Sequence, residues 1–344
     1  MKKQYLSAFA LALFASTAFA QITTRDQANK QIEALEIVNQ AAATTAKSAV
    51  ASASDADGYN SAVKTFYKAI DGSKVYFTNS ARGGKNYLTV SPDFAVAGDR
   101  TNTPTAENVF ELQYNETNNG FVLKHAVTGR MLKNLPGLYT PIPTTSEEGG
   151  SYSFVPSGQN NTFSLRNDAA GGNQNFLHLA NDKNGARYNV VRWNAGSGAI
   201  NDASTWSLEN ASNVTDDELF EAAGDRFMAL NLLDAPLGNS FGQRFVSEET
   251  KATLQKFKNA QADLGDVQDL LSAYADKTSF TFNMPAAGDF FRIKSNDGSR
   301  YVTANGATDG AAWQLKTTTD STDEGTIFGY DGSHLVSLST GRAV

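Results

Sequence analysis

The chain of 344 residues contains no cysteine. Disulfides, thiolate chemistry and metal sites with Cys ligands are therefore excluded. An export signal that attaches lipid to a mature N-terminal cysteine is excluded for the same reason. The stability of the fold has to come from buried apolar surface and hydrogen bonds.

Positive charge is also scarce, with 29 Lys and Arg against 36 Asp and Glu and a net charge of −7. Nucleic-acid binding requires a basic face, and an anionic membrane surface attracts clusters of Lys and Arg. The composition therefore disfavours both nucleic acid and membrane surfaces as partners.

Long apolar runs are missing as well. The stretch Tyr5–Phe14 is too short for a spanning helix, which needs about 20 apolar residues. It follows Lys2-Lys3 and precedes Ala18-Phe19-Ala20, the basic, apolar and small-x-small order of a secretory signal peptide. We expect residues 1–20 to be removed, leaving no membrane span. The mature protein then begins near Gln21 and is secreted or at the cell exterior, the periplasm included.

No catalytic motif stands out, so an enzyme is not favoured, although the paired carboxylates of a glycosidase converge only in space. His125, His178 and His334 are scattered without metal-ligand spacing, and packing roles are favoured for them. The segment Asp55-Ala56-Asp57-Gly58 lacks the further oxygen ligands of a calcium loop and is interpreted as a turn. We expect no metal and no cofactor.

Composition divides the mature chain into four segments. Residues 21–72 and 212–284 are predicted to be helical, and the second of these begins with the capping-box pattern Thr215 to Glu218. Residues 73–211 and 285–344 are rich in Gly, Asn, Thr and aromatics, as in antiparallel sheets.

Residues 75–210 contain three units of about 45 residues, each with an apolar strand, a turn and a closing aromatic. The recurring positions, expected to be buried, are Phe77, Val122 and Leu165, then Leu88, Leu132 and Leu177, and finally Phe110, Phe154 and Trp206. No single unit can bury its apolar face. Three units around a pseudo-threefold axis can do so, in a closed six-stranded barrel capped by three hairpins.

The triplication resembles a ricin-type β-trefoil. The triplets Asn108-Val109-Phe110, Tyr152-Ser153-Phe154 and Ser204-Thr205-Trp206 occupy the place of that family's Gln-x-Trp signature; none keeps the Gln and only the third keeps the Trp. The resemblance implies a mixed, multidomain fold in which a β-trefoil barrel alternates with helical segments. It also implies carbohydrate binding.

The last segment echoes the first strand-rich segment. Residues 75–80 are matched by residues 290–295, and Thr128-Gly129-Arg130 is matched by Thr340-Gly341-Arg342, 212 positions later. His125 and His334 are expected at comparable positions of the two copies. These matches predict a duplicated helical-plus-trefoil module whose second trefoil is incomplete, from a fragment or a truncated product.

The third unit holds the candidate site. A turn acid, a loop aromatic and a late amide are the features with which lectins of this fold hold a sugar, and here they are Asp168, Trp193 with Asn194, and Asn201. The alternative is that Trp193 packs under its Gly-rich loop and that Asn201-Asp202 form a turn.

Two functions from different classes remain open. The first is an exported, non-catalytic, lectin-like protein that binds a carbohydrate or glycoconjugate. The second is an accessory or structural part of a larger exported enzyme or cell-surface assembly.

Overall fold

The computed structural model describes residues 22–157, 161–167, 175–195, 200–230, 248–276, 287–295, 298–305 and 315–343. They belong to two compact units, Met1–Leu219 and Phe220–Val344, and each unit is described by itself. The expected signal peptide lies outside the described residues.

Three helices open the first unit, and each begins at a side chain that accepts a backbone N–H. They are α1 (Arg25–Glu33) after Thr24, α2 (Gln40–Ser52) after Asn39, and α3 (Ala56–Ala69) after Asp55. Such caps satisfy N–H groups that the first helical turn leaves without partners. The Asp55 side chain accepts from the N–H of Gly58, so Asp55–Gly58 is a helix start, which agrees with the turn interpretation.

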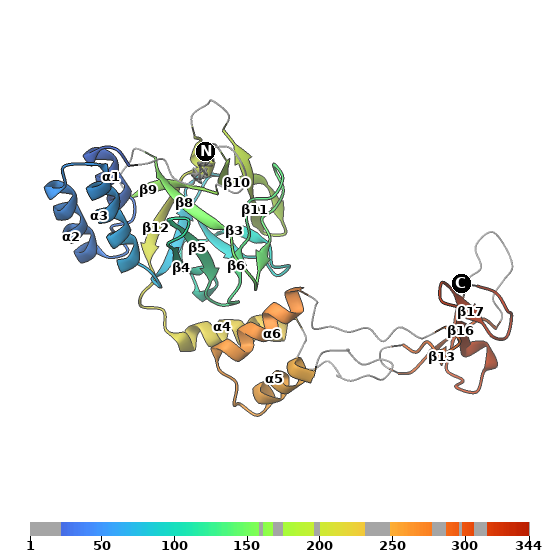
Figure 1. Ribbon diagram of the computed structural model, residues 1–344. Coiled ribbons are helices and arrows are strands. Elements are labelled where there is room, and N and C mark those ends of the chain that lie inside the picture. The colour runs from blue at the N-terminus through green and yellow to red at the C-terminus, as the bar shows by residue number, and fades with distance from the viewer. Residues whose placement is uncertain are drawn as a thin grey trace, which may run out of the picture. The chain divides into compact units, whose positions relative to one another are not determined.

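Helices α1 and α3 pack against the strands that follow them, and α2 packs on α1 and α3 (Figure 1). Tyr67 of α3 is buried, with its ring 5.0 Å from that of Phe121 and 5.9 Å from that of Tyr114. Its hydroxyl donates to Gln31 of α1 at 3.0 Å. Burial raises the pKa of Tyr67. The helical segment therefore shares a core with the sheet and is more than a spacer.

Six strands of the first unit pair in a closed ring. Their order around the ring is β1 (Lys74–Asn79), β4 (Val109–Asn115), β5 (Gly120–His125), β8 (Ser151–Pro156), β9 (Thr162–Arg166) and β12 (Trp206–Asn210), which pairs again with β1. All six pairings are antiparallel. A closed ring has no edge strand that could pair with another chain.

Three hairpins complete the architecture, one in each of the three repeat units of residues 75–210. They are β2 (Asn86–Val90) with β3 (Val96–Arg100), β6 (Met131–Leu132) with β7 (Thr144–Thr145), and β10 (Asn175–Asn184) with β11 (Arg187–Asn194). Short 3₁₀ helices, η1 (Ala106–Asn108) and η3 (Asp202–Ser204), precede β4 and β12. A six-stranded barrel with three hairpins is a β-trefoil, so the expected fold class is confirmed.

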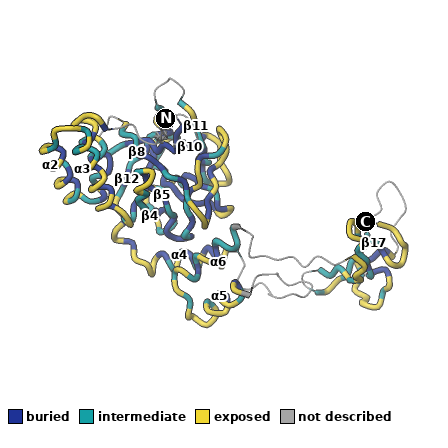
Figure 2. Tube along the Cα trace, in the orientation of Figure 1, coloured by how far each residue is buried: buried dark blue, intermediate teal, exposed yellow. Residues whose placement is uncertain are grey.

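The barrel interior is buried throughout (Figure 2). Eight of the nine expected core positions are at most 1% exposed, namely Phe77, Leu88, Phe110, Leu132, Phe154, Leu165, Leu177 and Trp206. Val122 is the exception: it is half-buried, because the large apolar side chains that β5 buries are those of Phe121 and Leu123. Successive strand residues point to opposite faces, so an error of one residue selects the wrong face.

Strand register also corrects which aromatic closes the second repeat unit of the barrel. Phe110 pairs with Val75, Trp206 pairs with Phe163, and Tyr152 occupies the same place opposite Phe121. Tyr152 is therefore the equivalent of Trp206, and Phe154 lies two residues further along β8. Both are fully buried aromatics, which is why spacing alone did not separate them.

Each repeat unit has a buried polar side chain at or just beyond the end of its first strand. This side chain bonds to the repeat unit that precedes it around the closed ring, which for the first repeat is the third. The amide of Asn79 donates to carbonyls of Ala203 and Thr205, and His125 Nε2 lies 2.9 Å from the Glu107 carbonyl oxygen. The amide of Asn167 donates to the Ser151 carbonyl at 2.8 Å. Buried carbonyls need such partners. His125 thus has the packing role expected of it.

The second compact unit, Phe220–Val344, contains helices and shorter strands. Its elements are α4 (Asp216–Ala229, which begins in the first unit), α5 (Glu248–Lys258), α6 (Leu264–Asp276), β13 (Phe290–Arg292), β14 (Tyr301–Thr303), β15 (Lys316–Thr318), η4 (Glu324–Thr326), β16 (Ile327–Tyr330) and β17 (Leu335–Ser337). Rings from α4 and α5 meet where Phe227 and Phe257 lie 5.5 Å apart. Within the described ranges, no helix is long and apolar enough to cross a membrane.

Strand pairing in this unit repeats the start of the first barrel. Phe328 pairs with both Phe291 and Ser337, as Phe110 pairs with both Val75 and His125. The echo of residues 75–80 therefore begins at Phe291, one residue later than the sequence comparison placed it. Ser337 takes the place of His125, so the expected match with His334 is wrong.

The two Thr-Gly-Arg turns have the same geometry. Gly129 has a φ of 68° and Gly341 a φ of 66°, and each donates its N–H to the carbonyl four residues earlier. Positive φ favours glycine, which explains the shared residue.

The segment limits 21–72, 73–211, 212–284 and 285–344 are kept as a proposal for the domain boundaries.

Residues of the second copy are less buried than their counterparts. Phe291 is half-buried, whereas its counterpart Val75 is 0% exposed. Tyr301-Val302-Thr303 matches Tyr87-Leu88-Thr89 in sequence, and Val302 is half-buried whereas Leu88 is 0% exposed. The neighbouring Phe290 is 66% exposed. The second copy therefore buries less apolar surface per strand than the first barrel.

We expect Trp206→Ala to lower the free energy of unfolding by about 3–5 kcal/mol, since a fully buried ring is deleted. The indole N–H also donates to the Leu177 carbonyl at 3.0 Å. Chemical denaturation measures the change. Trp193→Ala is the matched control, because that ring is only half-buried and its removal should cost less. Equal losses in the two variants would contradict the assignment of Trp206 to the core.

Candidate functional site

Trp193 lies on β11, in the hairpin of the third unit. Its side chain is half-buried, and its ring stacks on that of His178, with 5.3 Å between centroids and 24° between planes. Trp193 pairs with Phe176 on β10, so His178 is its diagonal neighbour across the two strands. Aromatic side chains at such diagonal positions are within contact distance.

The His178 ring is held at both nitrogens. Its Nε2 lies 3.2 Å from Nη2 of Arg82, and its Nδ1 lies 2.9 Å from the Ser204 hydroxyl. A guanidinium only donates, so Nε2 accepts and the proton of the neutral ring is on Nδ1. Burial, together with the Arg82 charge, lowers the pKa of His178 to about 4. The support beneath Trp193 is therefore rigid and uncharged at neutral pH.

The residues on either side of Trp193 in β11, Arg192 and Asn194, carry guanidinium and amide groups that point to the opposite face of the hairpin. Asn194 is exposed and donates to Oδ1 of Asn175 at 3.0 Å. Arg192 donates to the same oxygen from Nε at 2.9 Å, and from Nη1 to the Pro136 carbonyl at 2.9 Å. This polar group is fixed by its own hydrogen bonds and reaches the surface at Asn194.

Asn201 begins the turn η3, and its side chain accepts the Ala203 N–H at 2.9 Å. The turn alternative considered for Asn201-Asp202 is thus what the structure contains. The same turn carries Ser204, which bonds to His178 under Trp193. Asn201 and Trp193 are therefore connected through two intervening side chains.

Asp168 lies outside the described residues. Its neighbour Asn167 is fully buried, and its amide donates to Asn134 at 2.9 Å as well as to the Ser151 carbonyl. Asn167 is thus engaged in tying the second and third units together. Of the four candidate residues, Trp193 and Asn194 are consecutive residues of β11 whose side chains point to opposite faces, and Asn201 lies in η3, the turn whose Ser204 bonds to His178.

The stacking surface belongs to the third unit. Strand register places Asp99 of β3 and Thr145 of β7 at the positions equivalent to Trp193 in the other two hairpins. In the second copy, Thr318 of β15 takes that place opposite Tyr301. Among these four described hairpins, the aromatic at this position is confined to the third unit of the first barrel.

Sequence reasoning missed the support of the site. His178 is two residues from Phe176 on one strand, and the alternation of strand residues could have suggested that both face Trp193. Arg82 is 96 residues away from His178 and comes from the first unit, and no local pattern indicates the contact. In the sequence, Ser204 stands out only as a member of the closing triplet Ser204-Thr205-Trp206.

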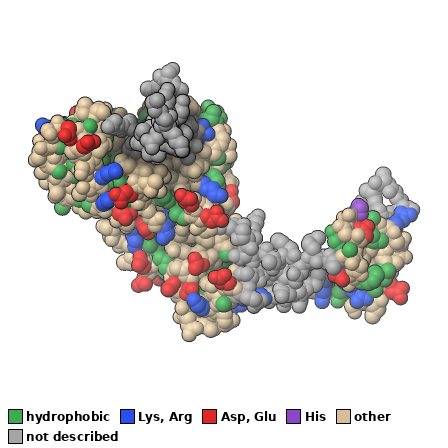
Figure 3. Space-filling model, in the orientation of Figure 1, with side chains coloured by type: hydrophobic (Ala, Val, Ile, Leu, Met, Phe, Trp, Pro, Cys, Tyr) green, Lys and Arg blue, Asp and Glu red, His purple; other side chains and the backbone are tan. Residues whose placement is uncertain are grey.

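Basic and acidic side chains are interspersed on the face of the molecule that Figure 3 shows. Within the part of the chain that the structure describes, there is no group of three or more His, Asp or Glu that could hold a metal ion.

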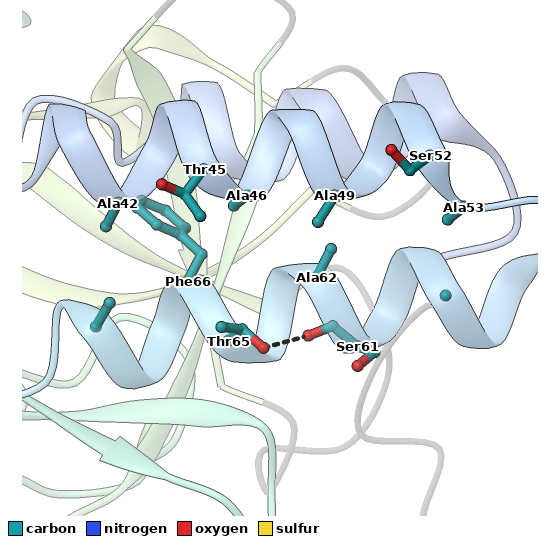
Figure 4. Close-up of a pocket in the computed structure, with 12 residues that line it drawn as sticks. Ala42, Thr45, Ala46, Ala49, Ser52, Ala53, Ser61, Ala62, Thr65 and Phe66 are labelled. Carbon is teal, nitrogen blue, oxygen red and sulfur yellow. Dashed lines mark hydrogen bonds between the residues drawn. The ribbon is translucent and has the colours of Figure 1, made fainter.

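A second concave feature lies between α2 and α3 (Figure 4). This groove of about 520 Å³ is lined mainly by Ala, Ser and Thr, with Phe66 at one side. The hydroxyls of Thr45, Ser52 and Thr65 each donate to a carbonyl of their own helix. The groove therefore presents small side chains and little free hydrogen-bonding capacity.

Comparison with solved structures found β-trefoil proteins. A designed threefold-symmetric protein, ThreeFoil, is 16% identical, with 40% of this chain and 98% of that chain covered and a TM-score of 0.32. The Rhizoctonia solani agglutinin is 14% identical, with 40% and 95% covered and a TM-score of 0.32. The Polyporus squamosus lectin, solved with a sialylated influenza-binding epitope, is 13% identical, with 80% and 95% covered and a TM-score of 0.32. No family model and no curated protein matches the chain.

We expect the pKa of His178 to rise in Arg82→Gln, because the variant removes a positive charge that opposes protonation. NMR titration of the ring protons measures the shift. An unchanged pKa would show that Arg82 does not act on this ring.

The depressed pKa also has a consequence for stability. Between about pH 6.5 and pH 4 the unfolded chain binds a proton at His178 that the folded chain does not, so stability falls as the pH falls through this range. His178→Gln should flatten this part of the pH profile in urea denaturation.

Proposed function

We propose that this protein is an exported, non-catalytic carbohydrate-binding protein, and that the third unit of its first β-trefoil holds the sugar. The observation that carries the proposal is Trp193, a half-buried ring whose support is fixed by Arg82 and Ser204. A rigid aromatic that remains partly exposed costs little entropy when a ligand stacks on it.

The surroundings of Trp193 suit a sugar in two ways. The indole offers an apolar face for the C–H groups of a pyranose, and the half-buried Arg82, which bonds to His178 beneath it, places a guanidinium on the same face of the hairpin as a donor for hydroxyls. Asp168 and Asn201 are proposed to complete the site from the first turn and from η3. A single shallow site of this kind binds weakly, with a Kd on the order of millimolar, or about 4 kcal/mol.

Trp193→Ala should abolish sugar binding and leave the fold intact, because the ring is half-exposed and its loss removes the stacking surface. Trp193→Phe is the matched control, and it should retain part of the affinity. A glycan array followed by isothermal titration of the best glycans measures binding, and circular dichroism checks the fold. Full binding by a folded Trp193→Ala protein would refute the site.

Export is tested separately by the mature N-terminus. Expression of the whole gene in a secreting host should give protein outside the cytoplasm whose first residue is Gln21, as determined by N-terminal sequencing. Protein that keeps residues 1–20 and stays in the cytoplasm would contradict the signal-peptide prediction.

The second candidate function is an accessory or structural part of a larger exported enzyme or cell-surface assembly. It is favoured by the recurrence of the strand pairing and of the Thr-Gly-Arg turn in the second unit, since repeated modules commonly serve as spacers or scaffolds. A folded protein that binds no glycan on the array would support this candidate over the first.

A further inference from the structure

The segment that joins β6 to β7, residues 133–143, runs along the outer edge of β11. The N–H of Tyr139 donates to the Arg192 carbonyl at 2.9 Å, and that of Ile142 donates to the Val190 carbonyl at 3.1 Å. Leu138 and Pro141 also form isolated bridges with Arg192 and Val191. A loop of the second repeat unit thus adds to the edge of the hairpin that carries Trp193.

This segment is fixed at several other points. Its Pro136 carbonyl accepts from the Arg192 side chain, and its Ile142 carbonyl accepts from the Val96 N–H at 2.8 Å. Ile142 itself is 0% exposed. Three prolines among its eleven residues further restrict the backbone. The segment is therefore held in one conformation before any ligand arrives.

The tip of this fixed segment exposes two large apolar side chains. Leu138 is 50% exposed and Tyr139 is 69% exposed, the largest value among the exposed large hydrophobic residues of the described chain. Tyr139 also has a φ of 58°, in the left-handed region that residues with bulky side chains rarely adopt. An exposed ring held in a strained backbone by surrounding hydrogen bonds contributes nothing visible to the core, and such outliers concentrate at ligand-binding positions.

We propose that Leu138 and Tyr139, here named the ledge, are a second contact surface for a saccharide of more than one sugar unit, whose first sugar lies on Trp193. This proposal rests on the proposed function. It assigns the ledge the role of selecting longer glycans over single sugars, which Trp193 alone does not provide.

Continuity with Trp193 supports this assignment. The ledge is hydrogen-bonded to Arg192, the residue directly before Trp193, and neighbouring strands lie about 4.8 Å apart. That spacing is close to the length of one pyranose unit in an oligosaccharide. The Tyr ring offers an apolar face and a hydroxyl. This combination matches a sugar, whose surface carries both C–H groups and hydroxyls, better than it matches the aliphatic surface of a protein partner.

The test compares single sugars with trisaccharides of the same kind by isothermal titration. Three matched series serve as probes: glucose with maltotriose, N-acetylglucosamine with chitotriose, and galactose with β1,4-galactotriose. The wild-type protein should bind the trisaccharide of at least one series about three- to tenfold more tightly than its single sugar, the gain that one aromatic contact supplies.

Tyr139→Asn is the informative variant, because Asn tolerates a left-handed backbone and removes only the ring. It should reduce the trisaccharide affinity to that of the single sugar and leave the single-sugar affinity unchanged. Tyr139→Phe should keep the advantage of the trisaccharide. Phe290→Ala, which removes an equally exposed ring from the other unit, should change neither affinity.

The outcomes separate the two proposals. An unchanged trisaccharide advantage in Tyr139→Asn overturns the ledge, and loss of binding in Trp193→Ala then still supports the site at Trp193. Loss of the advantage in Tyr139→Asn together with full binding by Trp193→Ala overturns that site and leaves the ledge as a binding surface. A wild-type protein that binds no saccharide in these series or on the array overturns both.

Discussion

The pairing of β1 with β12 is the constraint on which the first barrel depends. It joins the first and last strands of the triplicated segment through Phe77 and Leu208, so that three units, none of which can cover its own apolar face, share one core. The ring of Phe77 meets Phe110, Phe154 and Phe163, which come from the first, second and third unit respectively. Closure therefore fixes the three hairpins relative to one another, and the surface between them can be built with groups from different units.

Buried polar groups carry this order from the barrel to the candidate site. Asn79 of the first unit donates to the carbonyls of Ala203 and Thr205 and so fixes the turn η3. The same turn presents Ser204 to His178, whose ring lies under Trp193. In the first repeat unit, Thr89 takes the place of His178 and donates to the Glu107 carbonyl, so tying the hairpin to the 3₁₀ turn that follows it is a shared structural role. The third unit uses the larger imidazole for that role, and the ring then also supports the indole.

The sequence was sufficient for the architecture and insufficient for the register and the site. Repeat spacing predicted three units, because positions that face a common core recur with the period of the repeat. Repeat spacing could not choose between Val122 and its neighbours or between Tyr152 and Phe154. Apolar residues stand close together in these strands, and only cross-strand pairing separates the two faces. Trp193 and Asn194 could be proposed together because they are adjacent in the sequence, but both lie in β11, where alternation points their side chains to opposite faces. The contact of Arg82 with His178 comes from closure of the barrel and has no local sequence signal.

Divergence among the three units is concentrated where closure makes no demand. Inside the barrel, the equivalent positions Phe110, Tyr152 and Trp206 are all aromatic and all fully buried, because the shared core constrains each of them. Outside it, the positions equivalent to Trp193 hold Asp99 and Thr145, and the connection that forms the ledge belongs to the second unit. A triplicated fold thus retains threefold symmetry where packing requires it and loses that symmetry at the surface between the second and third hairpins. That surface joins a supported indole to a rigid exposed tyrosine, an arrangement that neither hairpin could provide without the other.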